Sequence, residues 1–179
     1  MGRMPQLIAP TTRLHRSWLA SLDEWGPGVH QDGASLPADV PALRSAAGFA
    51  DWVEQLLLQA DPTSERPHGY VPATTLWVAD DDSYLGAIQL RHTLNPHLLE
   101  VGGHVGYGIR PSARGRGLAT WALGEVLPRA RRLDLDSILV TCDDTNLASA
   151  AVIERNGGEL EDVREHAPGA RQRRYWIAL

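Results

Sequence analysis

The chain has 179 residues, 43% of them hydrophobic and 22% charged, which is the composition of a globular domain with a buried core. Its formal net charge of −5 argues against nucleic acid as the main partner, because binding phosphate needs a basic surface. A single cysteine, Cys142, allows no internal disulfide, and no apolar run reaches the ~20 residues that cross a membrane, so we expect a cytoplasmic protein without a membrane partner.

Apolar periodicity predicts two helices followed by strands in the first part of the chain. Thr11 or Thr12 can cap the first helix, in which Leu14 and Trp18 recur at helical spacing. Further along, the period changes to the alternation that is typical of strands, with a polar turn between two of them. The expected elements are a strand at 6–9, helices at about 12–25 and 49–59, loops at 26–45 and 61–72, and strands at 74–79, 84–90 and 104–109.

The second part of the chain predicts a β-α-β unit and two closing strands. A helix from about Gly117 carries Leu118, Ala122 and Val126 on one stripe, and Pro128 should end or kink it. Together with the first part, this order predicts one mixed α/β domain over 1–179. The remaining elements are a strand at 137–142, a helix at 147–155 closed by 156–158, and strands at 159–164 and 174–179.

A strand, a turn with two glycines and a helix follow one another between Tyr107 and Ala119. Free amides at a helix N-terminus attract anions, and glycine lets the backbone approach a phosphate closely. Two common nucleotide motifs fail here, because Leu118 replaces the lysine of the P-loop and Thr120 replaces the third glycine of the dinucleotide fingerprint. The segment therefore predicts a phosphate site of another kind.

Arg114, Gly117 and Ala119 form the pattern R-x-x-G-x-A, which resembles the Q/R-x-x-G-x-G/A signature of the GNAT superfamily of N-acetyltransferases. The resemblance extends to a bacterial subgroup of predicted acetyltransferases. It covers the chain from about residue 70 onward, and the first 70 residues resemble the subgroup poorly. The segments that carry this wider likeness are 74–77, 91–95, 102–107, 110–112 and 174–177.

The resemblance implies a fold and a cofactor. The implied fold is a central mixed, mostly antiparallel sheet flanked by helices, in which strand 104–109 splays away from strand 137–142. Acetyl-CoA (coenzyme A) would bind with its thioester in the gap between these strands. The implied cofactor ligands are Ile109, Arg110, Arg114, Gly115, Arg116, Gly117, Leu118, Ala119, Asn146 and Ser149.

The resemblance also implies direct attack by an amine, which needs a base for the ammonium group and an acid for the departing thiolate. The commonest base position of the family falls on Gly103, which can do no acid-base work, so its neighbours His104 and Glu100 are the candidates. The alternatives are a structural histidine and a solvated glutamate. Ile153 stands where many relatives carry the acidic tyrosine, which leaves Tyr107 as the candidate acid.

Other polar residues give weaker signals. Arg91, His92 and Asn95 follow a predicted strand and are candidates for the acceptor pocket, with a plain polar loop as the alternative. Asn146 can cap a helix as well as contact the cofactor. Cys142 lies in an apolar strand, where cysteine behaves as a small hydrophobe and not as a nucleophile. No histidine or cysteine pair stands at ligand spacing, so we expect no metal.

Three functions remain open at this stage. The first is an N-acetyltransferase that acts on a primary amine of a small molecule or peptide. The second is a non-catalytic acyl-CoA-binding or sensor domain, which is favoured by Gly103 and Ile153 at the positions of the usual base and acid. The third is a structural α/β domain whose Gly-rich turn holds no ligand. The acceptor and the acyl preference stay open, and so does a homodimer, which GNAT relatives often form.

Overall fold

The structure, a computed structural model, describes residues 4–179, so the first three residues of the predicted domain lie outside it. The strands in this range are β1 (Gln6–Ile8), β2 (Ala73–Asp80), β3 (Ser83–Arg91), β4 (Val105–Ile109), β5 (Ser137–Asp143), β6 (Glu159–Ala167) and β7 (Ala170–Ala178). They form one mixed sheet in the order β1-β2-β3-β4-β5-β7-β6. Neighbours are antiparallel except for β4 and β5, which run parallel.

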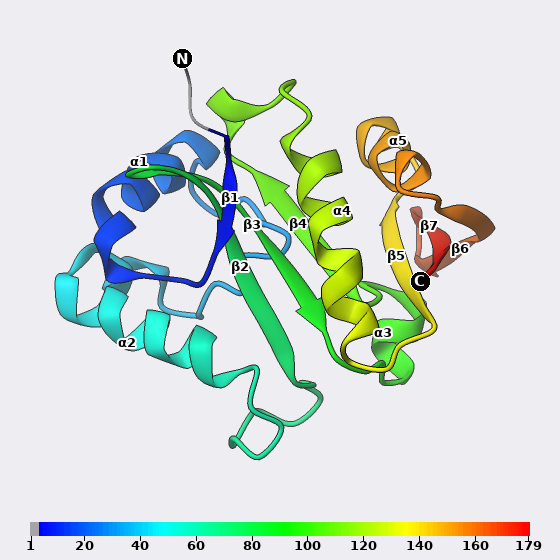
Figure 1. Ribbon diagram of the computed structural model, residues 1–179, viewed down its shortest axis with the longest axis horizontal. Helices are drawn as coiled ribbons and strands as arrows, with labels where there is room; N and C mark the ends of the chain where they lie inside the picture. Colours follow the sequence, from blue (N-terminus) through cyan, green and yellow to red (C-terminus); the bar gives the residue numbers. More distant parts are fainter. Residues whose placement is uncertain (1–3) are drawn as a thin grey trace.

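The helices are α1 (His15–Trp25), α2 (Ala46–Leu58), α3 (Pro96–Glu100), α4 (Leu118–Arg131) and α5 (Leu147–Arg155). They cover both faces of the sheet (Figure 1). Each face has its own apolar core. On one face, α1 and α2 bury aromatic side chains such as Trp18 and Phe49. On the other face, α4 and α5 bury aliphatic side chains such as Leu123 and Ile153. Within residues 4–179, no helix is both long and apolar enough to span a membrane.

The expected order of elements holds, with two local corrections. The segment after β3 is not a plain loop, because Asn95 caps α3 by accepting a hydrogen bond from the Leu98 amide at 2.8 Å, and Pro96 suits the first turn. Pro128 does not end α4, which continues to its last residue at 131. Ala130, in this last turn, is fully buried, so the helix keeps packing against the core after the proline.

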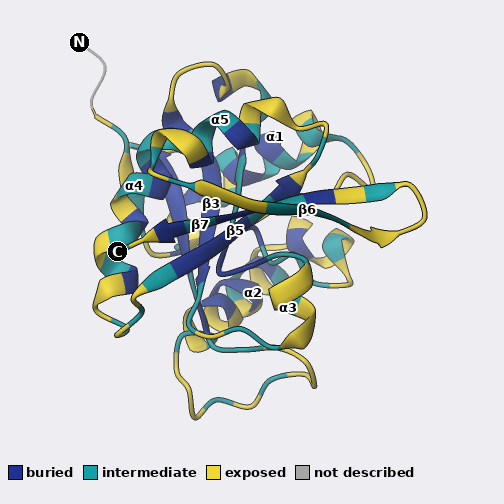
Figure 2. Cartoon of the chain, turned by 90° about the vertical axis from the view of Figure 1, so that its right-hand side faces the viewer, coloured by how far each residue is buried: buried dark blue, intermediate teal, exposed yellow. Residues whose placement is uncertain are grey.

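The C-terminal hairpin places β7 inside the sheet and β6 at its edge. β7 pairs with both β5 and β6, and its Tyr175 and Ile177 are buried. Figure 2 shows the contrast between the largely buried β5 and β7 and the mostly exposed β6. β5 lies between β4 and β7; it pairs with β7 along its whole length but with β4 only at Val140, so its open edge is the one that faces β4.

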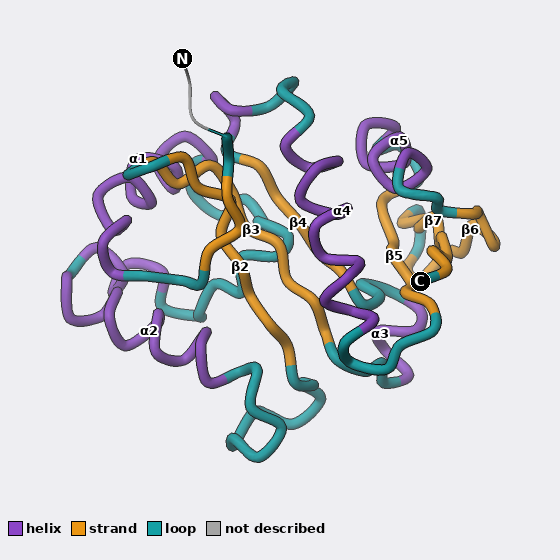
Figure 3. Tube along the Cα trace, viewed as in Figure 1, coloured by secondary structure: helices purple, strands orange, loops and turns teal. Residues whose placement is uncertain are grey.

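The parallel pair β4 and β5 is short and divergent, which confirms the predicted splay. Val105 and Val140 are paired in register, and beyond them the two strands separate (Figures 1 and 3). Just before this pair, the His104 amide donates to the Leu139 carbonyl at 2.7 Å, and the Leu139 amide donates to His104 Nδ1 at 2.9 Å. The strands are therefore held together at one end, and the gap opens toward the start of α4.

Replacing Trp77 by alanine should lower the free energy of unfolding by about 3–5 kcal/mol, because the buried indole packs against the rings of Phe49, Trp52 and Tyr84 and its removal leaves a cavity. Urea unfolding followed by circular dichroism measures the change. Leu57→Ala is the control on the exposed side of α2, and it should cost less than ~0.5 kcal/mol. Equal effects of the two variants would contradict the assignment of this core.

Candidate functional site

A cavity of about 840 Å³ lies where β4 and β5 part. Its walls come from both strands, the turn before α4, the first turns of α4, one side of α5 and the loop that follows α1. Cavities of this size hold small molecules and cofactors. Among the residues that the structure describes, no group of histidine, cysteine, aspartate and glutamate side chains is arranged to hold a metal ion.

The cavity has two chemically different sides, because successive side chains of a strand point to opposite faces of a sheet. Tyr107 and Cys142 adjoin the aliphatic core under α4 and α5, and we call this the α4 side. Thr141 and Asp143, which flank Cys142 along β5, point to the other face, and we call this the α1 side. The α4 side also holds Asn146 and Ser149, and the α1 side also holds His30, Asp32, Arg91 and Gln172.

The Gly-rich turn forms an open cradle at the N-terminus of α4. Gly115 and Gly117 both have φ of 74°, a left-handed backbone that favours glycine. A Cβ atom added at either position would meet nothing within 4 Å, so packing does not account for the glycines. No side chain of residues 4–179 caps α4. Its first amides are therefore free to bind an anion, and the helix dipole adds to the attraction.

Most of the predicted cofactor ligands lie around this cavity. Arg116 is exposed in the turn and Arg110 points away from it, so these two do not contribute to the lining. The predicted ligands that line the cavity are Ile109, Arg114, Gly115, Gly117, Leu118, Ala119, Asn146 and Ser149.

Two residues at the end of α1, Glu24 and Trp25, contact arginines of the segment that forms the cradle. Glu24 accepts hydrogen bonds from Arg110 Nε at 2.7 Å and from the Ser112 amide at 3.1 Å, and the bond with Arg110 lowers the pKa of Glu24 to about 2. The guanidinium carbon of Arg114 lies 4.6 Å from the centroid of the Trp25 ring. These side chains fix the turn and leave anion binding to the backbone. Sequence reasoning did not find Glu24, because its partners lie more than 80 residues away.

Two hydroxyl groups meet on the α4 side. The Tyr107 and Ser149 hydroxyl oxygens are 2.6 Å apart. Burial raises the pKa of Tyr107, so its hydroxyl keeps its proton at neutral pH. Asn146 caps α5 by accepting a hydrogen bond from the Ser149 amide at 3.0 Å, and it lines the cavity as well. Burial also raises the pKa of the neighbouring Cys142 thiol, which keeps that group protonated.

His104 lies beside the cavity but outside its lining, and only 5% of it is exposed. Its Nδ1 accepts the Leu139 amide, so the ring proton resides on Nε2 and the ring is neutral. Burial lowers the pKa of His104 to about 4, and the nearby charge of Arg91 acts in the same direction. In this state His104 completes the pairing of β4 with β5.

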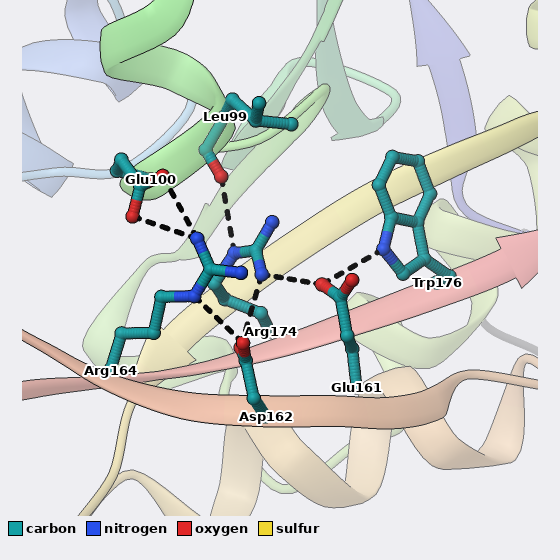
Figure 4. A network of polar contacts seen from close by, with 7 residues as sticks. All are labelled: Leu99, Glu100, Glu161, Asp162, Arg164, Arg174 and Trp176. Atoms are coloured by element: carbon teal, nitrogen blue, oxygen red, sulfur yellow. Dashed lines mark hydrogen bonds and ion pairs between the residues drawn. The ribbon is translucent and has the colours of Figure 1, made fainter.

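Glu100, at the end of α3, also lies outside the cavity lining. Both of its carboxylate oxygens accept hydrogen bonds from Arg164 Nη1 at 2.9 Å. Figure 4 shows this pair beside the buried Arg174, which donates to the Leu99 carbonyl at 3.1 Å and to Asp162 at 3.0 Å. The network ties α3 to the hairpin of β6 and β7, and it engages the carboxylate of Glu100 away from the cavity.

Of the three residues predicted for the acceptor pocket, Arg91 lines the cavity and the other two do not. His92 makes a 2.8 Å hydrogen bond with the Thr74 hydroxyl. Asn95 donates to the Gly69 carbonyl at 2.7 Å in addition to capping α3. Both residues therefore serve the loops around β2 and β3.

Four polar residues of the α1 side were missed by the sequence interpretation. His30 and Asp32 come from the loop after α1, and their side chains pair at 2.9 Å between Nε2 and Oδ1. Gln172 of β7 donates to the carboxylate of Asp143 at the end of β5. The His-x-Asp spacing was the one available signal. The loop reaches the cavity because Gly106 and Gly108 of β4 have no side chains to keep it away.

Comparisons with known proteins agree with this geometry. The family model described as acetyltransferase (GNAT) domain matches residues 16–159. Comparison with curated proteins gives no match. Among solved structures, RimL, a ribosomal L7/L12 alpha-N-protein acetyltransferase in complex with coenzyme A, is 19% identical over 98% of this chain and 94% of its own, with a TM-score of 0.67.

Two further structures have similar scores. MccE, the microcin C7 self-immunity acetyltransferase in complex with acetyl-CoA and AMP, is 16% identical over 98% of this chain and 92% of its own, with a TM-score of 0.67. A Salmonella typhimurium acetyltransferase that modifies the N-terminal serine of ribosomal protein L7/L12 is 18% identical over 98% and 95%, with a TM-score of 0.65. At these identities the likeness shows the shared fold.

The neutral state of His104 predicts a loss of stability in acid. The unfolded residue takes up a proton near pH 6.5 and the folded one only near pH 4, so the free energy of unfolding should fall as the pH drops through this window. His104→Asn offers an oxygen acceptor to the Leu139 amide and does not titrate. Urea unfolding between about pH 7 and about pH 4.5 should therefore give a smaller fall in this variant than in the wild type. Equal falls would show that His104 does not titrate in this way.

Proposed function

The chain belongs to the GNAT family of acetyltransferases, and we propose that it transfers an acetyl group from acetyl-CoA to a primary amine of a small molecule or peptide. The observation that carries this proposal is the cradle of Gly115 and Gly117, which opens directly onto the gap between β4 and β5. An anion site next to the gap between the two strands suits a ligand that carries a pyrophosphate at one end and a long arm at the other.

The residues around the cavity fit acetyl-CoA. The amides from Gly115 to Ala119 would hold the pyrophosphate, since they are open and no side chain caps the helix. Asn146 and Ser149 would border the pantetheine arm on the α4 side. When bound, acetyl-CoA supplies a thioester whose carbonyl carbon is open to attack by an amine. β4 stays paired with β3 along its length, but beyond Val105 its other edge has no strand partner, and backbone amides on that edge are placed to polarise that carbonyl.

We propose that the Tyr107 and Ser149 hydroxyls act as one proton donor for the departing thiolate. They are in hydrogen-bond contact and both line the cavity. This pair weakens the case for a non-catalytic sensor, which rested on Ile153 at the position of the usual tyrosine. Ile153 is fully buried in the core behind α5, and the hydroxyl function comes from Tyr107 on β4 instead.

For the base we propose the pair of His30 and Asp32 on the α1 side. The two side chains are 2.9 Å apart, and both line the cavity. An imidazole oriented by a carboxylate is a common arrangement for proton removal. The negative charge of Asp32 also acts on Tyr107 and Arg91, which supports a location close to the site of transfer. His104 and Glu100 are weaker candidates, because neither lines the cavity, and His104 Nδ1 and the Glu100 carboxylate already accept hydrogen bonds from the protein.

The Gly117→Glu variant tests the cradle. A side chain and a negative charge at the phosphate site should weaken acetyl-CoA binding by more than about tenfold in calorimetry. Gly169→Glu is a matched control, because Gly169 also has a left-handed backbone, with φ of 75°, and open space around it, but lies in the turn between β6 and β7. Unchanged affinity in Gly117→Glu would remove the cradle from the proposed function.

Replacing Tyr107 by phenylalanine or Ser149 by alanine tests the proton donor. Each change should lower kcat by about 10- to 100-fold with little effect on the dissociation constant of acetyl-CoA. Because the two hydroxyls act together, the double variant should lose little more than the worse single one. Full turnover in both single variants would mean that the thiolate leaves without their help, and additive losses would mean that they act separately.

A further inference from the structure

The guanidinium of Arg91 is a half-buried cation on the α1 side whose hydrogen-bonding capacity is only partly used. Its Nη1 donates to the carbonyls of Gly102 at 2.8 Å and Gly103 at 3.0 Å. Across residues 4–179, its Nε and Nη2 have no hydrogen-bond or ion-pair partner. Nη2 lies beside Gly106 of β4, 3.6 Å from where a Cβ atom would stand, so this free edge is next to the gap between the strands.

In the part of the chain that the structure describes, no carboxylate pairs with this edge. The charge of Asp32 acts on Arg91, but the Asp32 carboxylate pairs with His30 and not with the guanidinium. Burial lowers the pKa of Arg91, which shows that the charged form loses solvation there. A cation held in this way is stabilised by an incoming anion, and the two free nitrogens of one guanidinium edge match the two oxygens of a carboxylate.

The rest of the α1 side has the opposite charge. Asp143 is held by a hydrogen bond from the buried Gln172, and only one of its two oxygens is engaged by that bond. Asp32 adds a second carboxylate from the loop after α1. An ammonium group would be attracted to these carboxylates and repelled by Arg91. The α1 side therefore offers separate positions for a positive and a negative group within one cavity.

Resting on the proposed function, we propose that the acceptor is a free amino acid, whose carboxylate binds Arg91 and whose amine lies toward Asp32 and Asp143. A diamine would set a second positive charge against Arg91. A peptide N-terminus carries no carboxylate beside its amine and would leave the free edge of Arg91 without a partner. Neither alternative uses both charges of the α1 side.

The first test compares the activity of the wild-type protein on amino acids with its activity on related amines that lack the carboxylate. Release of the CoA thiol is followed with a panel of amino acids, the corresponding carboxamides, diamines and short peptide amides. For the best amino acid, kcat/KM should exceed that of its carboxamide by about tenfold or more, which is the effect of one charged hydrogen-bond pair. Equal values for the acid and the amide, or a preference for diamines or peptides, would overturn the inference and leave the acetyltransferase proposal intact.

Arg91→Lys provides the second test, because lysine keeps a positive charge and a donor for the Gly102 and Gly103 carbonyls but lacks the two-nitrogen edge. KM for the amino acid should rise about tenfold, while kcat/KM for the carboxamide and the affinity for acetyl-CoA stay near wild type. Equal losses for acid and amide would assign Arg91 to structure alone.

Binding separates this inference from the proposed function. Calorimetry of the panel against the CoA-loaded protein reports amino acid binding without any turnover. Amino acid binding that is lost in Arg91→Lys would support the inference even if the acetyl group were not transferred. Failure of CoA itself to bind, in a protein that unfolds cooperatively, would overturn the proposed function and the inference together.

Discussion

The parallel contact between β4 and β5 is the constraint on which the site depends. Two strands of a sheet satisfy each other's backbone groups as long as they run side by side, and here they do so at Val105 and Val140 before they separate. His104 closes the near end, because its ring takes the place of a carbonyl and accepts the Leu139 amide. Beyond that point the facing edges of both strands are open to hydrogen bonding by a ligand with amide groups of its own.

The second requirement is a rigid anion site at the open end of that gap. The turn at Gly115 and Gly117 has a left-handed backbone and little packing of its own, so its shape must be held from outside. Glu24 and Trp25 do this from the end of α1, through Arg110 and Arg114. Arg110 and Arg114 are thereby engaged with the protein, and the backbone amides of the turn stay open to a ligand.

How far the sequence predicted this arrangement depends on the range of the interactions involved. The cradle was predictable because its glycines and the following helix lie within a few residues of one another, and the order of strands and helices followed from periodicity. The roles of His104 and Glu24 depend on partners 35 and 86 residues away, which no local pattern specifies. The loop with His30 and Asp32 escaped notice for the same reason, since it meets β4 only in the folded chain. The missed helix α3 is five residues long, too short for a periodic signal.

The distribution of chemistry over the two sides of the cavity favours direct transfer over a covalent enzyme intermediate. Cys142 is the only thiol in the chain, and its raised pKa, caused mainly by burial, disfavours the thiolate that would attack a thioester. The α4 side otherwise offers neutral hydroxyls, which suit protonation of a departing thiolate. The α1 side offers an imidazole paired with a carboxylate, which suits removal of a proton from an amine. With the proposed acid and the proposed base on opposite sides of the sheet, an amine would attack from one side while the thiolate leaves on the other, and no residue of the chain would need to carry the acetyl group.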